Sequence, residues 1–158
     1  MYDNATQVQL KYMQSSNVIL NVDSKSDEFQ DWLVKGLTLA YVTDLLPEQK
    51  EVPFDYALSV VKEDAEDCIL VVVEDGTRFT LAIFALGQVS HHVSGEGCVI
   101  FTMIGNGTHK TASKVLRIIR AIAKDCKWLQ VQRRIAPYTY QGKYYKLRGY
   151  YERDQESV

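Results

Sequence analysis

Two glycines stand where an apolar run meets a basic segment, in the order Gly105-Asn106-Gly107. The run before them, residues 98–104, predicts a β-strand, and apolar positions recur at helical spacing from Val115 onward. A strand, a glycine turn and a helix N-terminus can together hold a phosphate, because free amides at the helix end point toward the ligand. The sequence therefore predicts a phosphate-binding turn here. An ordinary turn is the alternative, because a Gly-x-Gly pair alone is a weak signal.

A tyrosine-dense segment follows this region, over residues 138–151. Tyrosine hydroxyls near a reaction centre can donate a proton to a leaving group. The alternative is that these tyrosines only fill this end of the fold, with their hydroxyls hydrogen-bonded.

A general base, which would accept a proton from a substrate, is harder to identify in the sequence than a proton donor. The apolar run at residues 98–104 contains no acid. Three carboxylates stand at the ends of predicted strands and two histidines stand in a predicted loop, namely Glu74, Asp75, Glu96, His91 and His92. All five are expected to be solvated loop residues rather than bases.

The elements that position these residues follow from hydrophobic periodicity and turn signals. Strands are expected at residues 17–22, 69–73, 79–86, 98–104, 128–132 and 150–153. Helices are expected from Ser24 and Ser26 to Pro47, after Pro53, around residues 115–124, and over residues 140–148. Asp75-Gly76 signals a hairpin turn between two of the strands.

This order predicts an α/β (α+β) fold, with a mixed, mostly antiparallel central sheet flanked by helices on both faces. Residues 17–158 are expected to form a single domain, and residues 1–16 an N-terminal arm. With 158 residues and 46% apolar side chains, the chain is large enough for a substantial core. No apolar run is long enough to span a membrane, and no secretory signal is recognised.

Three widely spaced cysteines, Cys68, Cys98 and Cys126, predict buried, reduced thiols in a cytoplasmic protein. A metal site built from His91, His92 and Cys98 is disfavoured, because their spacing matches no common zinc pattern. The sequence also lacks a Gly-x-Ser-x-Gly or Walker-type loop, which removes the commonest hydrolase and nucleotide triphosphatase motifs.

The net charge of −2 conceals an uneven distribution. Residues 1–109 contain 6 basic and 16 acidic side chains, whereas residues 110–158 contain 12 basic and 4 acidic ones. The basic part could serve a phosphorylated cofactor, a nucleic acid or an acidic protein partner. The acidic part could attract a cationic amine. Equally, the two halves could complement each other within one fold.

The element order and the C-terminal residues resemble the GCN5-related N-acetyltransferases. The resemblance covers roughly residues 17–154 in topology and is residue-specific only near the C-terminus. It implies acetyl-CoA as co-substrate, held in a gap where the central strand splays from its neighbour. The pantetheine arm would pair with the backbone of Thr102, Met103 and Ile104. The diphosphate would lie on the turn and the start of the following helix, at Gly105, Asn106 and Gly107.

This turn departs from the family pattern, which places Arg or Gln three residues before the first glycine. Thr102 occupies that position here. The loop also looks longer than usual, with Thr108, His109, Lys110 and Thr111 preceding the apolar helix face. These four residues are expected to donate hydrogen bonds and charge to phosphates in place of the missing side chain.

The family closes with a Tyr, three residues, then Gly and an aromatic, and Tyr145 to Tyr150 has that spacing. By the resemblance, Tyr145 would protonate the departing coenzyme A thiolate. The Asn that the family usually has before this segment is absent here, and Tyr138 lies near the corresponding position. The implied activity is acetyl transfer to a primary amine, on a small molecule or a protein, in the cytoplasm.

Two other functions remain open. Degenerate acetyltransferase-like domains of this size occur among bacteriophage proteins, so a non-catalytic binding or structural protein, in the host cytoplasm or the virion, fits the altered turn. A nucleic-acid-binding module fits the basic residues of the C-terminal third. These are Lys114, Arg117, Arg120 and Lys124 on a helix face, and Arg133, Arg134 and Lys143 among Tyr138, Tyr140, Tyr144 and Tyr145.

Overall fold

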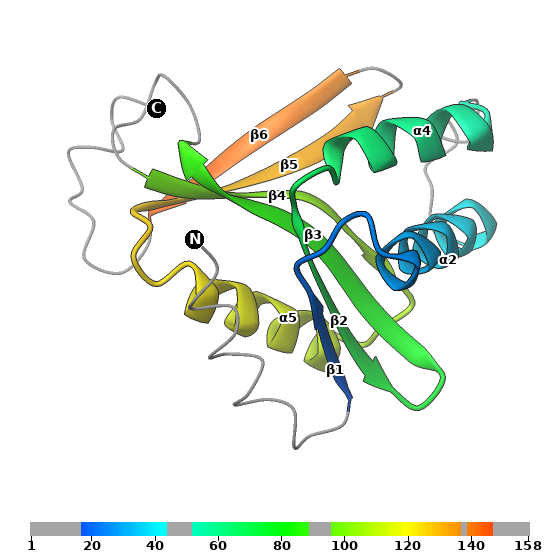
Figure 1. Cartoon of the computed structure of the whole chain (residues 1–158), viewed down its shortest axis with the longest axis horizontal. Helices are drawn as coiled ribbons and strands as arrows, with labels where there is room; N and C mark the ends of the chain where they lie inside the picture. The colour runs from blue at the N-terminus through cyan, green and yellow to red at the C-terminus, as the bar shows by residue number, and fades with distance from the viewer. Residues whose placement is uncertain (1–16, 44–51, 89–95, 137–138, 147–158) are drawn as a thin grey trace.

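The structure, a computed structural model, describes residues 17–43, 52–88, 96–136 and 139–146 (Figure 1). Its elements, in chain order, are β1 (Val18–Asn21), α2 (Asp27–Thr43), α4 (Phe54–Asp64), β2 (Ile69–Asp75), β3 (Arg78–Gln88), β4 (Glu96–Gly105), α5 (His109–Ile122), β5 (Trp128–Ala136) and β6 (Thr139–Lys146).

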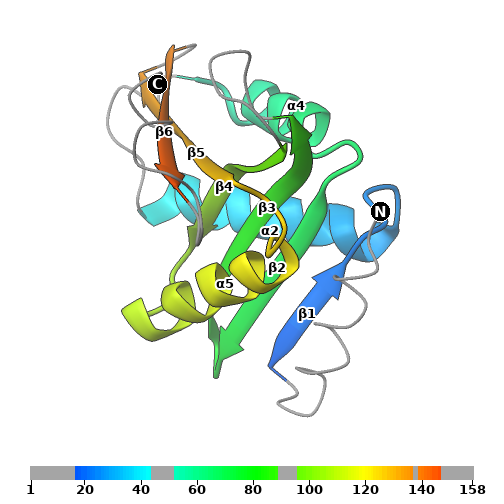
Figure 2. The same ribbon diagram turned by 90° about the vertical axis from the view of Figure 1, so that its left-hand side faces the viewer.

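The strands of this part of the chain form one 6-stranded sheet in the order of the sequence. Every neighbouring pair is antiparallel except β4 and β5, which run parallel. Helix α5 covers one face of the sheet, and α2, with α4 packed on it, lies on the other (Figure 2). The predicted mixed, mostly antiparallel sheet with helices on both faces is therefore confirmed.

Strand β2 shows why the sheet needs helices on both sides. Ile69, Val71 and Val73 face the core under α5, while Leu70 and Val72 face the core under α2. All five side chains are buried. A strand buried on both faces loses the alternation of polar and apolar residues, which explains the continuous apolar run in the sequence.

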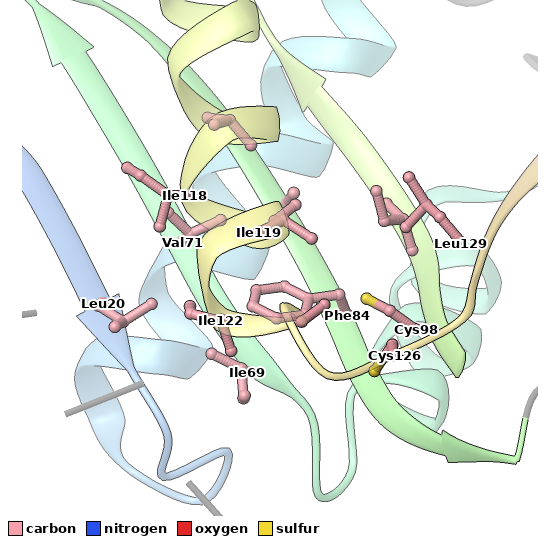
Figure 3. Packing of buried hydrophobic residues seen from close by; sticks show 14 of the residues in the cluster. Leu20, Ile69, Val71, Phe84, Cys98, Ile118, Ile119, Ile122, Cys126 and Leu129 are labelled. Atoms are coloured by element: carbon pink, nitrogen blue, oxygen red, sulfur yellow. The ribbon is translucent and has the colours of Figure 1, made fainter. Parts of the chain in front are cut away.

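The core under α5 is built from the apolar stripe of that helix (Figure 3). Ile118, Ile119 and Ile122 pack in one cluster with buried residues of the sheet, among them Val71 and Ile69 of β2 and Phe84 of β3. Burying one such aliphatic side chain contributes about 1.5–3 kcal/mol to folding. This packing fixes where the N-terminus of α5 stands relative to the sheet.

Helix α2 begins where the sequence predicts, because the Ser26 hydroxyl accepts a hydrogen bond from the Phe29 amide at 3.2 Å. Farther along the helix, Gly36 lies against the end of β4. A Cβ there would come within 2.8 Å of Ile104 Cδ1, so the glycine allows α2 to approach β4 closely. The far end of β4 is thus held against α2.

Two expectations from the sequence are wrong. Residues 140–148 were expected as a helix, but Thr139–Lys146 forms strand β6, which pairs with β5. Residues 108–111 were expected as a loop extension, but α5 begins at His109. The expected arm at residues 1–16 and the expected strand at residues 150–153 lie outside the described residues.

Candidate functional site

Strands β4 and β5 separate part of the way along their length. They pair in parallel only from Gly97 opposite Trp128 to Ile100 opposite Val131. Beyond that point β4 continues to Gly105 and β5 to Ala136, and the two strands diverge (Figure 1). We name this divergence, between residues 101–105 of β4 and 132–136 of β5, the β4–β5 fork. Each of its strands pairs with a described strand only on the side away from the fork.

A β-bulge stands at the base of the fork. On β3, Ile83 pairs with Thr102, but the next residue, Phe84, pairs with Ile100, so Phe101 is an extra residue in β4. A bulge bends its strand and increases the local twist. Because it coincides with the last β4–β5 pair, the bulge accounts for the direction in which β4 leaves β5.

The bulge also changes which side chains face which helix. Ile100 lies in the core under α5, whereas Phe101 packs against the core under α2. Thr102 is paired with Ile83, whose side chain also belongs to the core under α2, and cross-strand partners share a face. Met103 then packs on the core under α5. The side chains of residues 101–104 thus point to the two faces of the sheet and are half-buried. The edge of β4 that faces the fork is therefore formed by backbone groups.

The turn after β4 is hydrogen-bonded to the start of β3. The Phe79 amide donates to Asn106 Oδ1 at 3.0 Å, and Arg78 Nε donates to the Asn106 carbonyl oxygen at 2.6 Å. A Cβ on Gly105, which has a φ of 135°, would collide with the Phe79 carbonyl oxygen. A Cβ on Gly107 would collide with the hydroxyls of Thr80 and Thr111. Packing on β3 therefore requires both glycines, whether or not a ligand binds.

Two threonines that were expected to donate to phosphates serve the fold instead. Thr108 is the N-cap of α5, and its hydroxyl oxygen accepts from the Thr111 amide at 3.3 Å. Thr111 Oγ1 donates to the Thr108 carbonyl oxygen at 2.9 Å and lies 2.8 Å from Thr80 Oγ1, in a buried hydrogen bond. These contacts hold the N-terminus of α5 in place.

The helix start still presents groups that suit an anion. The first intrahelical hydrogen bond runs from the Ala112 amide to the Thr108 carbonyl oxygen. The amides of His109 and Lys110 precede it, so neither has a carbonyl partner within the helix. Both side chains are exposed. The positive end of the helix dipole adds to the favourable potential at this point.

One cation near the turn was missed from the sequence. Arg78 is the only Lys or Arg between Lys62 and Lys110, and its guanidinium lies on the turn through the bond to Asn106. A single cation in the acidic half of the sequence is the feature by which Arg78 could have been identified.

The Lys35 ammonium on α2 lies over two aromatic rings, 4.6 Å from the ring centre of Trp32 and 5.3 Å from that of Phe79.

A hollow of about 410 Å³ lies beside the N-terminal half of α5. It is lined by Asn17, Val73, Glu74, Asp75, Lys110, Thr111, Lys114 and Arg117. This places Glu74 and Asp75 at the end of β2, and β3 separates β2 from β4. Neither carboxylate therefore lies beside the fork, where the resemblance to the acetyltransferases would require a general base.

The other residues considered as general bases are Glu96, His91 and His92. Glu96 begins β4 at the paired end, away from the fork. His91 and His92 lie outside the described residues.

Tyr145 lies on β6, not on a helix. Its backbone is opposite Leu129 of β5, which is opposite Cys98 of β4. This row crosses the paired end of β4 and β5, two residues before the fork opens at Ile100 and Val131. The structure thus brings residues 102–110 together as one strand, turn and helix start, and places the Tyr145 backbone across β5 from them.

The cysteines are buried thiols, as expected. Burial, with smaller contributions from Asp64 and Asp67, raises the pKa of Cys68 to about 11. Burial, together with the neighbouring Cys126 and Cys68, raises the pKa of Cys98 further still. Thiols held neutral in this way are poor nucleophiles and poor metal ligands. Within the described ranges, no group of three or more His, Cys, Asp or Glu side chains is suited to a metal ion.

No protein-family model matches the chain, and no curated protein matches it. None of the helices that the structure describes is long and apolar enough to cross a membrane.

Proposed function

We propose that this chain is an acetyl-CoA-dependent N-acetyltransferase of the GCN5-related type, acting on a primary amine. The observation that carries the proposal is the β4–β5 fork, which leads directly into the glycine turn and the start of α5. An extended ligand with amide groups needs an unpaired strand edge, and a diphosphate needs a helix N-terminus. In this chain the two features follow one another within residues 101–110.

The proposed cofactor site uses this order. Backbone groups of Thr102, Met103 and Ile104 would pair with the pantetheine arm, as an added strand does. The diphosphate would accept hydrogen bonds from the amides of His109 and Lys110, with the Lys110 ammonium supplying charge. Gly105, Asn106, Gly107 and Thr108 would act indirectly, because their contacts with β3 and α5 hold the turn in position.

The proposed chemistry is direct transfer in a ternary complex. The neutral amine nitrogen attacks the thioester carbonyl carbon and forms a C–N bond, and the C–S bond then breaks. Tyr145 would give its phenolic proton to the departing thiolate, which makes the thiolate a better leaving group. The proton lost by the amine would pass to water, and Tyr145 would regain its own from solvent.

The second candidate is a non-catalytic binding or structural protein with the same fold, in a host cytoplasm or a phage particle. One observation favours it: packing on β3 and capping of α5 account for the glycines and threonines of the turn without a ligand. The first candidate places the protein in the cytoplasm, where acetyl-CoA is found and where buried thiols stay reduced.

Calorimetric titration with acetyl-CoA and coenzyme A separates the two candidates. We expect 1:1 binding with a micromolar dissociation constant that weakens as salt rises, because charged phosphates are recognised. Lys110→Ala is expected to weaken binding, and Lys62→Ala on α4 serves as a control cation far from the turn. Failure of a folded sample to bind either ligand would favour the non-catalytic protein.

The role of Tyr145 needs an activity measurement with a panel of primary amines. Tyr145→Phe is expected to lower the acetylation rate by about 10²-fold or more, as loss of a general acid does, with acetyl-CoA binding unchanged. An unchanged rate would remove Tyr145 from the mechanism and leave the cofactor site untouched.

A further inference from the structure

Helix α5 and the turn after it carry cations without an intervening acid. Residues 109–124 contain five Lys or Arg residues and no Asp or Glu, the cations being Lys110, Lys114, Arg117, Arg120 and Lys124. They follow one another at spacings of three or four, which places neighbours on one side of a helix. We name these five residues the basic stripe.

The stripe lies away from the sheet. The buried positions of α5 are Thr111, Val115, Ile118, Ile119 and Ile122. Of the five cations, all are exposed except Lys114, which is half-buried and donates to Asn17 Oδ1 at 3.3 Å. In the part of the chain that the structure describes, no carboxylate forms an ion pair with the four exposed cations.

Helix stability does not explain this arrangement. Arg120 and Lys124 lie near the C-terminal end, where cations interact favourably with the helix dipole. Lys110, however, lies in the first turn, which has no acidic residue, and there a cation is unfavourable. Like charges three or four residues apart also repel each other along the helix. The charges of the basic stripe therefore lower the stability of α5. An arrangement of charges that destabilises its own helix is typical of a surface that binds a partner.

We propose that the basic stripe of α5 binds the phosphodiester backbone of a nucleic acid. From Lys110 to Arg120 the stripe runs about 15 Å along the helix, since each residue rises about 1.5 Å. Phosphates on one DNA strand recur about every 3.4 Å along the axis, so a row of cations about 4.5–6 Å apart can contact several successive phosphates without matching them one to one. The carboxylates of an acidic protein surface have no fixed repeat, because their positions depend on that protein's own sequence, whereas every nucleic acid carries a regular row of phosphates. Contacts of this kind bind without reading the base sequence.

The hollow beside α5 sets a limit on this surface. Glu74 and Asp75 lie on its β2 side, opposite Lys110 and Arg117. Their negative charge repels phosphates that approach the N-terminal half of the stripe. The strongest contacts are therefore expected at Arg120 and Lys124, with Arg117 at the border of the hollow, and the carboxylates reduce affinity rather than contribute to it.

The test is fluorescence anisotropy of a labelled 20-base-pair DNA duplex, titrated with the full chain over a series of salt concentrations. The variant Arg117→Gln/Arg120→Gln is compared with the control Lys25→Gln/Lys62→Gln, which removes the same charge from exposed sites elsewhere. Because each phosphate contact contributes about 0.9 to the slope of log K against log salt, the first variant is expected to lower the slope by about 1.8. The control is expected to leave it unchanged.

Asp75→Asn provides a change in the opposite direction. Its side chain is exposed, so the substitution is not expected to disturb folding, and removing its charge is expected to strengthen DNA binding several-fold. Circular dichroism of every variant establishes that the fold is retained.

Three results would overturn the proposal. One is the absence of wild-type binding at low salt. Another is an equal loss of slope in the stripe variant and the control. The third is equally tight binding of polyglutamate, which would identify the stripe as a surface for acidic protein segments.

Discussion

The two halves of β4 differ more than their sequences suggest. Residues 97–100 pair with β3 on one side and β5 on the other, and three of the four are buried. Residues 102–105 pair with β3 alone, Phe101 is the bulge, and all five are half-buried, although they are as apolar as the first half. We refer to these as the paired half and the fork half. One strand therefore contributes both a part of the core and the edge proposed to bind a cofactor.

A single extra residue separates the halves. Phe101 bulges from the β3 ladder at the last β4–β5 pair, so direction, pairing and side-chain orientation change together. This local irregularity converts a buried strand into an edge without any change in composition.

Truncating the paired half should destabilise the protein most. Ile100 is 1% exposed in the core under α5, so Ile100→Ala is expected to lower the free energy of unfolding by about 2–5 kcal/mol. Met103→Ala in the fork half should lower it by less, because the side chain is half-buried. Urea denaturation measures both. Equal losses would contradict a difference in packing between the halves.

The glycine that ends the fork half should tolerate no side chain. Gly105→Ala is expected to lower the free energy of unfolding by about 2–4 kcal/mol, from backbone strain at a φ of 135° and collision with β3. Gly76→Ala is the control, because its φ is 64° but no atom lies within 4 Å of the added Cβ. That control should lose only about 1 kcal/mol. A Gly105 variant no less stable than the control would mean that the turn does not pack on β3.

The buried threonine pair behind the turn should show coupling. Thr111→Val leaves the Thr80 hydroxyl without its buried partner, so a loss of about 1–3 kcal/mol in unfolding free energy is expected. Adding Thr80→Val should cost less than the sum of the single losses, because no hydroxyl is then left unpaired. Thr38→Val, on the exposed side of α2, is the control. Additive losses would show that the two hydroxyls do not interact.

Alkaline pH should affect the paired half through Cys98. Its pKa is raised by burial, so ionisation of the unfolded chain draws the equilibrium toward unfolding once pH exceeds the ordinary thiol pKa of 9.0. The stability that this thiol contributes is present below that pH and is lost above it, at about 1.4 kcal/mol per pH unit. The stability difference between wild type and Cys98→Ala should therefore shrink between pH 9 and 10. A constant difference would mean that Cys98 is not held neutral.

Much of the fold could be predicted from local patterns. The apolar run of β2, the apolar stripe of α5 and the serine cap of α2 each specify their element within a short window. Because the order of elements then limits the sheet, the mixed topology with helices on both faces also follows.

The wrong predictions concern segments whose structure depends on contacts with residues distant in the sequence. Residues 140–148 look helical alone, but pairing with β5 makes Thr139–Lys146 a strand. The sequence pattern does not reveal the N-cap role of Thr108. The turn after β4 packs on β3, and α5 therefore begins at His109, before the apolar face that starts at Val115. The bulge at Phe101 and the contact of Arg78 with the turn depend on register, which no local pattern reveals.

For the candidate site, the sequence located the strand, turn and helix start but not their surroundings. It identified residues 102–110 as one unit, and they are continuous in space. It assigned the hydroxyls of Thr108 and Thr111 to a ligand, whereas both are used by the fold.

Amide-resolved hydrogen exchange, with and without coenzyme A, tests whether the fork half of β4 pairs with the cofactor. Without ligand, those amides of residues 101–104 that point into the fork should exchange faster than the amides of residues 97–100, because they lack a β5 partner. With ligand, exchange should slow at Thr102, Met103 or Ile104 and at His109 and Lys110, and remain unchanged in β1. Protection confined to other elements, or none despite saturating ligand, would contradict the claim.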